Sequence, residues 1–424
     1  MPDFAKALRG LANLNLRPPA DEEGHDHEAL QFGPLSLSLA EQLQFLRLRN
    51  HATSNSLPKG EVHSNALGSH YFIHAVYPED YWHGKVHLSR FSSPDLECLM
   101  RVMRAADPVP HRDRIVFLDT ETTGMQGGTG MCPFLVGIGY FAGAEFHMAQ
   151  FFIRDFDEEP SMLLALGDCL RQFELVITYN GAAFDIPLLE TRFTLARLDQ
   201  PLQSTPHFDL LFTARRLWRA GHGSCRLVAL EREMLSFLRG PDIPGAMIPR
   251  TYFDYLQRRP APGLYSIFTH NAHDVVSLAA LTVTACDRIT LEPAELDDPL
   301  DLYSLARVIE NTSDWRRTIQ LYEMALRGGL SEPVRRKALE SFAAVCRRSG
   351  EHDRGLQICS ELMRYPEFSM AGYEGAAIYY ERIAKDFDAA VRVLAEGLIH
   401  AETRRSRALL QARWDRLQQK RLEI

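Results

Sequence analysis

The segment that most constrains the fold of this 424-residue chain is a short apolar run that ends in two carboxylates. Residues 115–118 are Ile-Val-Phe-Leu, and Asp119, Thr120 and Glu121 follow directly, before a Thr-Thr-Gly turn. This β-branched and aromatic composition predicts a buried strand. Because side chains alternate along a strand, Asp119 and Glu121 project from the same side. Two close carboxylates repel unless a proton or cation lies between them, and such a pair suits Mg²⁺ or Mn²⁺.

A second segment, residues 174–193, adds a third carboxylate. It contains a short apolar run that is closed by Asn180 and Gly181, after which Asp185 opens a stretch with helical apolar spacing. The pattern predicts a strand followed by a helix that starts near Asp185. An acidic residue at that point complements the N-terminal end of the helix dipole.

The third segment, FTHNAHDVVSLAALTVTAC, carries the fourth carboxylate on a predicted helix. His270 and Asp274 are four residues apart, so they share one face of that helix. His273 points about 100° away from Asp274, given 3.6 residues per turn. His270 is therefore the better partner for a metal bound by Asp274.

These three segments resemble, in their order along the chain, the motifs of the DEDD superfamily of 3′–5′ exonucleases, which have a ribonuclease-H-like fold. Asp119 and Glu121 match the first motif. Asp185 matches the Asn-Gly-x-x-Phe-Asp form of the second motif, and Asp274 matches the last acid. His270 stands at the spacing of the superfamily's Tyr branch but is the residue type of its His branch.

The surrounding sequence resembles more closely the bacterial YprB-type family of ribonuclease-H-like exonucleases. The similar segments lie between about residues 60 and 290 and are TTGMQGGTGMCPFLVGIGYF, HFDLLFTARRLW, SCRLVALEREML, RGPDIPGAMIPRTYFDYL and HNAHDVVSLAAL. Their shared order makes the resemblance more specific than any one segment. It implies an α/β ribonuclease-H-like mixed sheet with helices on both faces, and a nuclease that uses two divalent cations, Mg²⁺ or Mn²⁺.

The resemblance also implies roles for single residues. Two cations about 3.5–4 Å apart serve phosphodiester hydrolysis in such nucleases. Asp119 is expected to bridge both ions, while Glu121 and Asp274 bind one of them. Asp185 is expected to bind the other ion through water, and His270 to accept the proton of the attacking water.

Further residues beside these acids are candidates for substrate binding or for support. Thr120, Asn180 and Phe184 are expected to contact the substrate, Phe184 by stacking on a base. Asp209, in HFDLL, is expected either to orient His207 or to cap the helix that follows, with capping favoured.

Composition places the chain among ordinary globular proteins. The net charge is −8 and the pI is about 6.1, which argues against a protein that coats nucleic acid but leaves room for a nuclease with local basic patches. The seven Cys form no CxxC pair, which predicts reduced thiols in a cytosolic protein without zinc. We see no signal-peptide pattern and no apolar run of about 20 residues, so we expect a cytoplasmic protein with no membrane contact.

Four regions are expected along the chain. Residues 1–35 are predicted to be flexible, residues 36–110 to form an accessory region that packs on the core, and residues 111–290 to form the exonuclease domain. Residues 297–424 have continuous helical periodicity, with three weakly similar helical pairs that resemble tetratricopeptide repeats and a capping helix at the end. A generic bundle of helical hairpins is the alternative for this last region.

The sequence thus predicts a metal-dependent 3′–5′ exonuclease of single-stranded nucleic acid, whose helical repeats dock a protein partner or the substrate. One alternative is a catalytically silent adaptor that binds nucleic acid or protein through the repeats, although the presence of all four acids weighs against it. Another is a structure-specific endonuclease with the same metal site. DNA and RNA substrates are not distinguished, because contacts to the 2′-hydroxyl leave no mark in the sequence.

Overall fold

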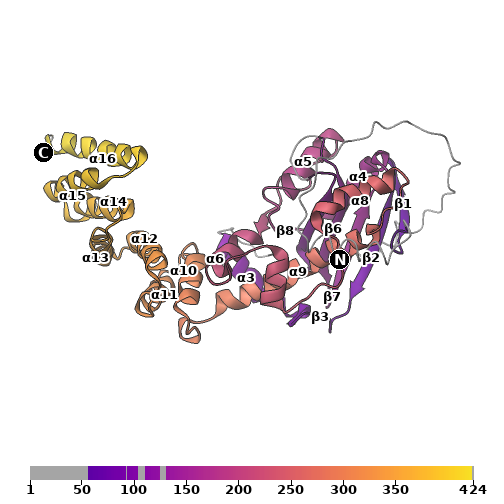
Figure 1. Ribbon diagram of the computed structural model, residues 1–424, viewed down its shortest axis with the longest axis horizontal. Coiled ribbons are helices and arrows are strands. Elements are labelled where there is room, and N and C mark those ends of the chain that lie inside the picture. Colours follow the sequence, from indigo (N-terminus) through magenta and orange to yellow (C-terminus); the bar gives the residue numbers. More distant parts are fainter. Residues whose placement is uncertain (1–55, 92, 104–109, 125–129, 423–424) are drawn as a thin grey trace. The chain divides into compact units, whose positions relative to one another are not determined.

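The computed structural model describes residues 56–91, 93–103, 110–124 and 130–422. Within these ranges, one mixed sheet has seven strands in the order β1-β2-β7-β6-β5-β8-β9 (Figure 1). The strands are β1 (Glu61–Asn65), β2 (Gly68–Tyr77), β5 (Ile115–Thr122), β6 (Pro133–Ala142), β7 (Glu145–Phe152), β8 (Leu175–Thr178) and β9 (His207–Asp209). β6 is antiparallel to both β5 and β7, whereas β8 is parallel to β5 and β9 is parallel to β8. The predicted mixed α/β sheet of the ribonuclease-H-like type is confirmed.

Helices form where the apolar spacing is helical. Those that accompany the sheet are α3 (Ser93–Met103), α4 (Glu159–Leu170), α5 (Asp185–Leu195), α6 (Leu210–His222), α7 (Leu227–Leu230), α8 (Ile248–Leu256) and α9 (Leu264–Thr290). A π-helical turn, η4 (Glu231–Leu235), and a 3₁₀ turn, η5 (Gly245–Met247), flank the segment between α7 and α8. A small hairpin of β3 (Trp82–His83) and β4 (Val86–His87) lies outside the main sheet.

Different helices cover the two faces of the sheet. On one face, Val116 and Leu118 of β5 share a buried cluster with Leu163 and Leu166 of α4. Asp119 points to the other face, because neighbouring side chains on a strand alternate. α9 lies against that other face, since it comes closest to the sheet at the glycines of β6.

The accessory region that we predicted at residues 36–110 contributes to the sheet itself. β2 pairs with β7 over seven residues, from Tyr71 opposite Phe152 to Tyr77 opposite Phe146, and β1 pairs with β2 at the sheet edge. Residues 36–55, and the segment 1–35 that we predicted to be flexible, lie outside the described residues.

The chain divides into two compact units. One contains the sheet and extends to Cys286. The other consists mainly of residues 287–424 and also includes the end of α3 and most of α6. The second unit is all-helical, as predicted, and its helices are α10 (Pro299–Ile309), α11 (Trp315–Arg327), α12 (Glu332–Ser349), α13 (His352–Leu362), α14 (Met370–Tyr379), α15 (Phe387–His400) and α16 (Arg404–Leu422).

The helical unit keeps local signals that the sequence contains. Asp314 and Asp386 cap α11 and α15, because their carboxylates accept the backbone N–H groups of Arg317 and Ala389. The second helices of the three predicted pairs are α11, α13 and α15, which begin at Trp315, His352 and Phe387. The relationship of these pairs to tetratricopeptide repeats stays a prediction.

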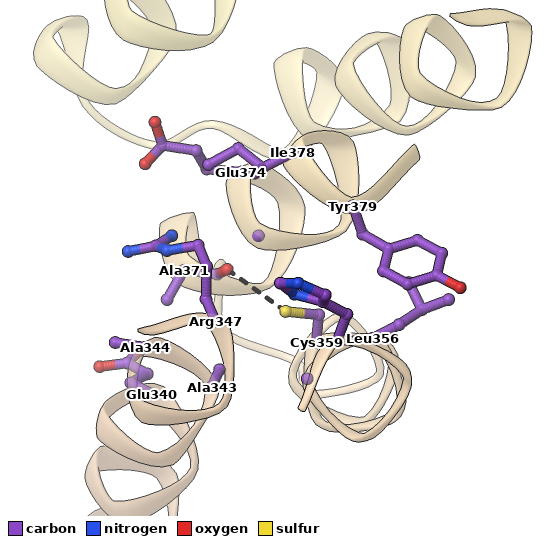
Figure 2. Close-up of a pocket in the computed structure, with 13 residues that line it drawn as sticks. Glu340, Ala343, Ala344, Arg347, Leu356, Cys359, Ala371, Glu374, Ile378 and Tyr379 are labelled. Atoms are coloured by element: carbon purple, nitrogen blue, oxygen red, sulfur yellow. Dashed lines mark hydrogen bonds between the residues drawn. The ribbon is translucent and has the colours of Figure 1, made fainter. Parts of the chain in front are cut away.

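Small side chains leave a cavity of about 140 Å³ between α12, α13 and α14 (Figure 2). Ala343 and Ala344 of α12 and Gly375 of α14 line it, with Arg347 and Glu374 as charged groups. None of the helices in the part of the chain that the structure describes is long and apolar enough to cross a membrane.

Candidate active site

The first two candidate acids lie where β5 reaches the end of its pairing with β6. Asp119 is opposite Gly137, Glu121 is opposite Leu135, and the register shifts directly after Glu121. Both carboxylates are partly buried. The strand therefore places the two acids on one face, as predicted, next to α9.

A buried amide of α9 holds Asp119 in place. Asn271 donates from Nδ2 to Oδ2 of Asp119 at 2.8 Å, and its Oδ1 accepts a hydrogen bond from Nε2 of Gln150 at 2.9 Å. Gln150 of β7 and Asp119 of β5 are both direct neighbours of Gly137 in the sheet. Asn271 thus lies over Gly137 and bridges the residues on either side of it.

Gly137 is what allows this close approach. A Cβ atom at this position would lie 2.2 Å from Oδ1 and 2.8 Å from Cγ of Asn271. Any larger side chain would therefore displace the amide or the helix.

The third acid, Asp185, enters from the first turn of α5. It is buried and accepts a hydrogen bond from Oγ1 of Thr120 at 2.5 Å. Burial raises the pKa of Asp185 to about 6, although the Thr120 hydrogen bond opposes the rise. Thr120, which we predicted to bind substrate, is therefore engaged with a neighbouring carboxylate.

The four acids act on one another's ionisation. Burial raises the pKa of Asp119 well above its usual range, and the negative charges of Asp274, Glu121 and Asp185 raise it further. Burial also raises the pKa of Glu121 to about 8, with Asp274 and Asp185 adding to the effect. The structure thus brings the four carboxylates of β5, α5 and α9 into one electrostatic environment.

His270 is surrounded by carboxylates. Its Nδ1 lies 2.8 Å from Oδ2 of Asp242, and its Nε2 lies 3.7 Å from Oδ2 of Asp274. Burial lowers the pKa of His270, but the nearby carboxylates, Asp274 foremost, outweigh burial and raise the pKa to about 9. His273 is directed elsewhere, with its ring against Phe237.

A buried arginine joins these groups. Arg239 donates from Nη1 to Oδ2 of Asp242 at 3.1 Å and from Nη2 to Asp274. It also forms a two-pronged ion pair with Glu231, with Nε at 2.7 Å and Nη2 at 2.5 Å from the carboxylate oxygens. The arginine side chain is only 6% exposed. Asp274, a proposed metal ligand, thus has a cationic partner within the protein.

The turn after β8 is fixed by Asp209. Its carboxylate accepts the backbone N–H groups of Asn180 at 2.8 Å, Ala182 at 3.1 Å and Leu211 at 3.0 Å. Asp209 therefore caps α6, as favoured, and also holds the Asn180 turn, where φ is +68°. His207 instead contacts Oγ1 of Thr178 at 2.8 Å.

Two residues that we predicted to contact substrate, Asn180 and Phe184, lie at this turn and differ in their exposure to solvent. Phe184 precedes α5 and its side chain is 51% exposed, so an aromatic face is open to solvent. Asn180 uses its backbone N–H to bond Asp209, while its side chain is half-buried.

The donor set fits Mg²⁺ or Mn²⁺ in chemical type, since both prefer carboxylate oxygens. Burial, with the neighbouring acids adding to it, raises the pKa of Asp119 and of Glu121. As the side chains stand, no group of three or more His, Cys, Asp or Glu in the described ranges is arranged to hold a metal ion. The pairing of Arg239 with Asp274 is one reason, because it turns one of the four acids toward a guanidinium.

Comparison with known proteins gives a family match and two similar proteins. Residues 116–286 match the model of the RNase_H superfamily. "Uncharacterized protein YprB" of Bacillus subtilis (strain 168) is 27% identical over 296 residues, which cover 69% of this chain and 70% of that protein. Among solved structures, the family B DNA polymerase from the archaeon Pyrobaculum calidifontis is similar with a TM-score of 0.34 and 16% identity, over 53% of this chain and 30% of the polymerase.

Four residues of this site were not found by sequence reasoning. Asn271 lies in the segment FTHNAHDVVSLAALTVTAC, but nothing in the sequence distinguishes it from the other residues of that helix. Arg239 and Asp242 belong to the Arg-Gly-Pro-Asp run, which was noted only for its resemblance, and Glu231 precedes it. An arginine and an acid in a Gly/Pro-rich segment between two helices were the available signal.

Proposed function

We propose that this protein is a metal-dependent 3′–5′ exonuclease that hydrolyses single-stranded nucleic acid. The observation that carries the proposal is the convergence of Asp119, Glu121, Asp185 and Asp274: the first two share one face of β5, Thr120 between them binds Asp185, and Asn271, on the same helix as Asp274, binds Asp119. Acids are brought so close at the cost of mutual repulsion, and a nuclease of this superfamily needs such a cluster for divalent cations.

In the proposed site, Asp119, Glu121, Asp185 and Asp274 hold two divalent cations, Mg²⁺ or Mn²⁺. When bound, these supply positive charge at the phosphate and lower the pKa of water. With this positive charge beside it, His270 would lose the proton that the carboxylates stabilise in the cation-free protein, and its Nε2 would then accept one proton of the attacking water. The water oxygen bonds to phosphorus, the P–O3′ bond breaks, and the leaving oxygen retains the electron pair and takes a proton from solvent.

The side chains have one rearrangement to make before cations bind. Asp274 is paired with Arg239, so its carboxylate must exchange the guanidinium for the cation. Phe184, exposed beside Asp185, is the proposed stacking surface for a base of the strand that enters the site.

The test is digestion of 5′-labelled single strands of DNA and RNA with Mg²⁺ or Mn²⁺. We expect a ladder that shortens from the 3′ end, and its loss in Asp119→Asn. The matched control is Asp157→Asn, which removes an exposed acid of the same unit outside the site. Full activity in purified Asp119→Asn would refute the assignment.

A silent adaptor is the second candidate, and the ion pair of Arg239 with Asp274 favours it, because an internal cation partly replaces a metal. Titration calorimetry with Mn²⁺ separates the two. The exonuclease binds Mn²⁺ and loses this binding in Asp119→Asn, whereas the adaptor gives no heat in either protein. A structure-specific endonuclease, with the same metal site, would instead cut circular or 3′-blocked strands.

The helical unit is proposed to dock a partner or the substrate. Its cavity between α12, α13 and α14 is one site with room for an inserted side chain (Figure 2). Ala344→Phe narrows this cavity and is expected to weaken docking without altering hydrolysis of short strands.

A further inference from the structure

We propose that Asp242 and Arg239 are positioning residues that fix the ring of His270 so that Nε2 is the nitrogen that exchanges a proton with the reacting water. This inference rests on the proposed nuclease function and deepens it. It concerns the segment between η4 and η5, to which neither the superfamily match nor the similar proteins assign a role.

The two nitrogens of His270 have different surroundings. Nδ1 lies 2.8 Å from Oδ2 of Asp242 and 3.3 Å from Nη1 of Arg239, so the shorter contact, to the carboxylate, is the one that takes the Nδ1 proton. Nε2 lies 3.7 Å from Asp274, beyond a direct hydrogen bond, and faces the acidic cluster. The ring is thus held by one edge and presents the other edge to the site.

Asp242 is itself held from two sides. Its Oδ1 accepts the backbone N–H of Ile243 at 2.8 Å, and its Oδ2 accepts Nη1 of Arg239 at 3.1 Å. The residue is 8% exposed, so little water competes for these oxygens. The Asp242 carboxylate is therefore held in one orientation. Because Nδ1 of His270 donates to this carboxylate, the imidazole ring is held in one orientation as well.

Arg239 ties the same segment to the rest of the site. Its two-pronged pair with Glu231, which is fully buried, fixes the guanidinium plane. From this plane, one amino group reaches Asp242 and another reaches Asp274. In the cation-free protein, a single guanidinium thus links the carboxylate that holds His270 to Asp274.

A purely structural ion-pair network would also explain the burial of these charges. The two roles differ in what they predict for His270. A structural network predicts a loss of stability without a change in the ring, whereas positioning predicts a change at Nδ1 and a loss in turnover that exceeds any change in substrate or metal binding.

The experiment uses the full chain with Asp242→Asn, an isosteric change that keeps a side-chain oxygen for the Ile243 N–H group. We expect kcat to fall roughly 10- to 100-fold, the range for losing a group that orients a functional His. KM for the oligonucleotide and the Mn²⁺ affinity from calorimetry should stay within about twofold, as for residues that do not touch the ligands. Asp254→Asn, which removes a partly exposed acid on α8, is the matched control.

NMR of the metal-free protein gives the readout that does not depend on activity. In the wild type, the Nδ1 proton of His270 should appear as a slowly exchanging downfield resonance, which is lost in Asp242→Asn and restored in Asp242→Glu. If Asp242→Asn does not fold, the comparison of wild type with Asp242→Glu and with His270→Gln assigns the same resonance.

A wild-type spectrum without that resonance, or an Asp242→Asn enzyme with wild-type kcat, would overturn the positioning role. Absence of hydrolysis by the wild type with the resonance present would instead refute the nuclease function and leave the Asp242–His270 contact established.

Discussion

Replacing Gly137 with Ala tests the close packing of α9 on the sheet. The added Cβ would lie 2.2 Å from Oδ1 of Asn271, whereas nonbonded heavy atoms prefer about 3.5 Å, so the amide must retreat by roughly 1 Å. That shift breaks the bonds of Asn271 to Asp119 and Gln150, which are 2.8 and 2.9 Å long. Two buried polar groups without partners cost about 1–3 kcal/mol each, so we expect a loss of about 2–6 kcal/mol.

Urea denaturation measures this loss, and a double-mutant cycle identifies its cause. With Asn271→Ala as the background, the clash is gone, so Gly137→Ala should then cost less than about 1 kcal/mol. Gly245→Ala is the matched control, because a Cβ there meets nothing within 4 Å. Equal costs of Gly137→Ala in both backgrounds would refute the argument that Asn271 is the obstacle.

Two further predictions concern charge. Without divalent cations, Glu121 keeps a proton up to a pKa of about 8 that the unfolded chain releases near 4.5, and His270 keeps one up to about 9 that the unfolded chain releases near 6.5. Both groups bind more protons in the folded state, and above about pH 7.5 the histidines whose pKa is lowered by burial, such as His70 and His83, are mostly neutral in both states. The melting temperature in EDTA should therefore fall as pH rises from 7.5 to 9; a rise would contradict the raised pKa values. Asp209→Asn removes one of three accepted N–H bonds, so we expect a loss of about 1–3 kcal/mol and weaker hydrolysis, measured by thermal unfolding and by the strand-digestion assay.

The strands and helices around the site follow from local patterns. The predicted strand at residues 115–118 and the predicted helix start near Asp185 agree with β5 and α5. The reason is that apolar periodicity and capping residues act over a few positions, within reach of a single segment. β5 extends past the apolar run to Thr122 because β6 pairs with it that far, which no local signal indicates.

Contacts between segments that lie far apart along the chain could not be predicted from the sequence. β2 joins the sheet by pairing with β7, about seventy residues further along the chain, and several antiparallel partners would have satisfied its alternating pattern. Arg239 meets Asp274 across 35 residues, from a Gly/Pro-rich segment without periodicity. The sequence shows where acidic and basic side chains occur, but not which of them form ion pairs with each other.

The hydrogen bonds of Arg239 also explain how the four acids can lie together without bound cations and still be able to bind cations. If Asp274 leaves the guanidinium for a cation, Arg239 keeps its two-pronged pair with Glu231 and its bond to Asp242. No buried charge is then left without a partner, which is the situation that makes breaking a buried ion pair costly. Under the proposed function, the exchange therefore needs only the movement of one carboxylate. Because Glu121 is protonated up to pH about 8, cation binding should also release protons, in an amount that falls as pH rises.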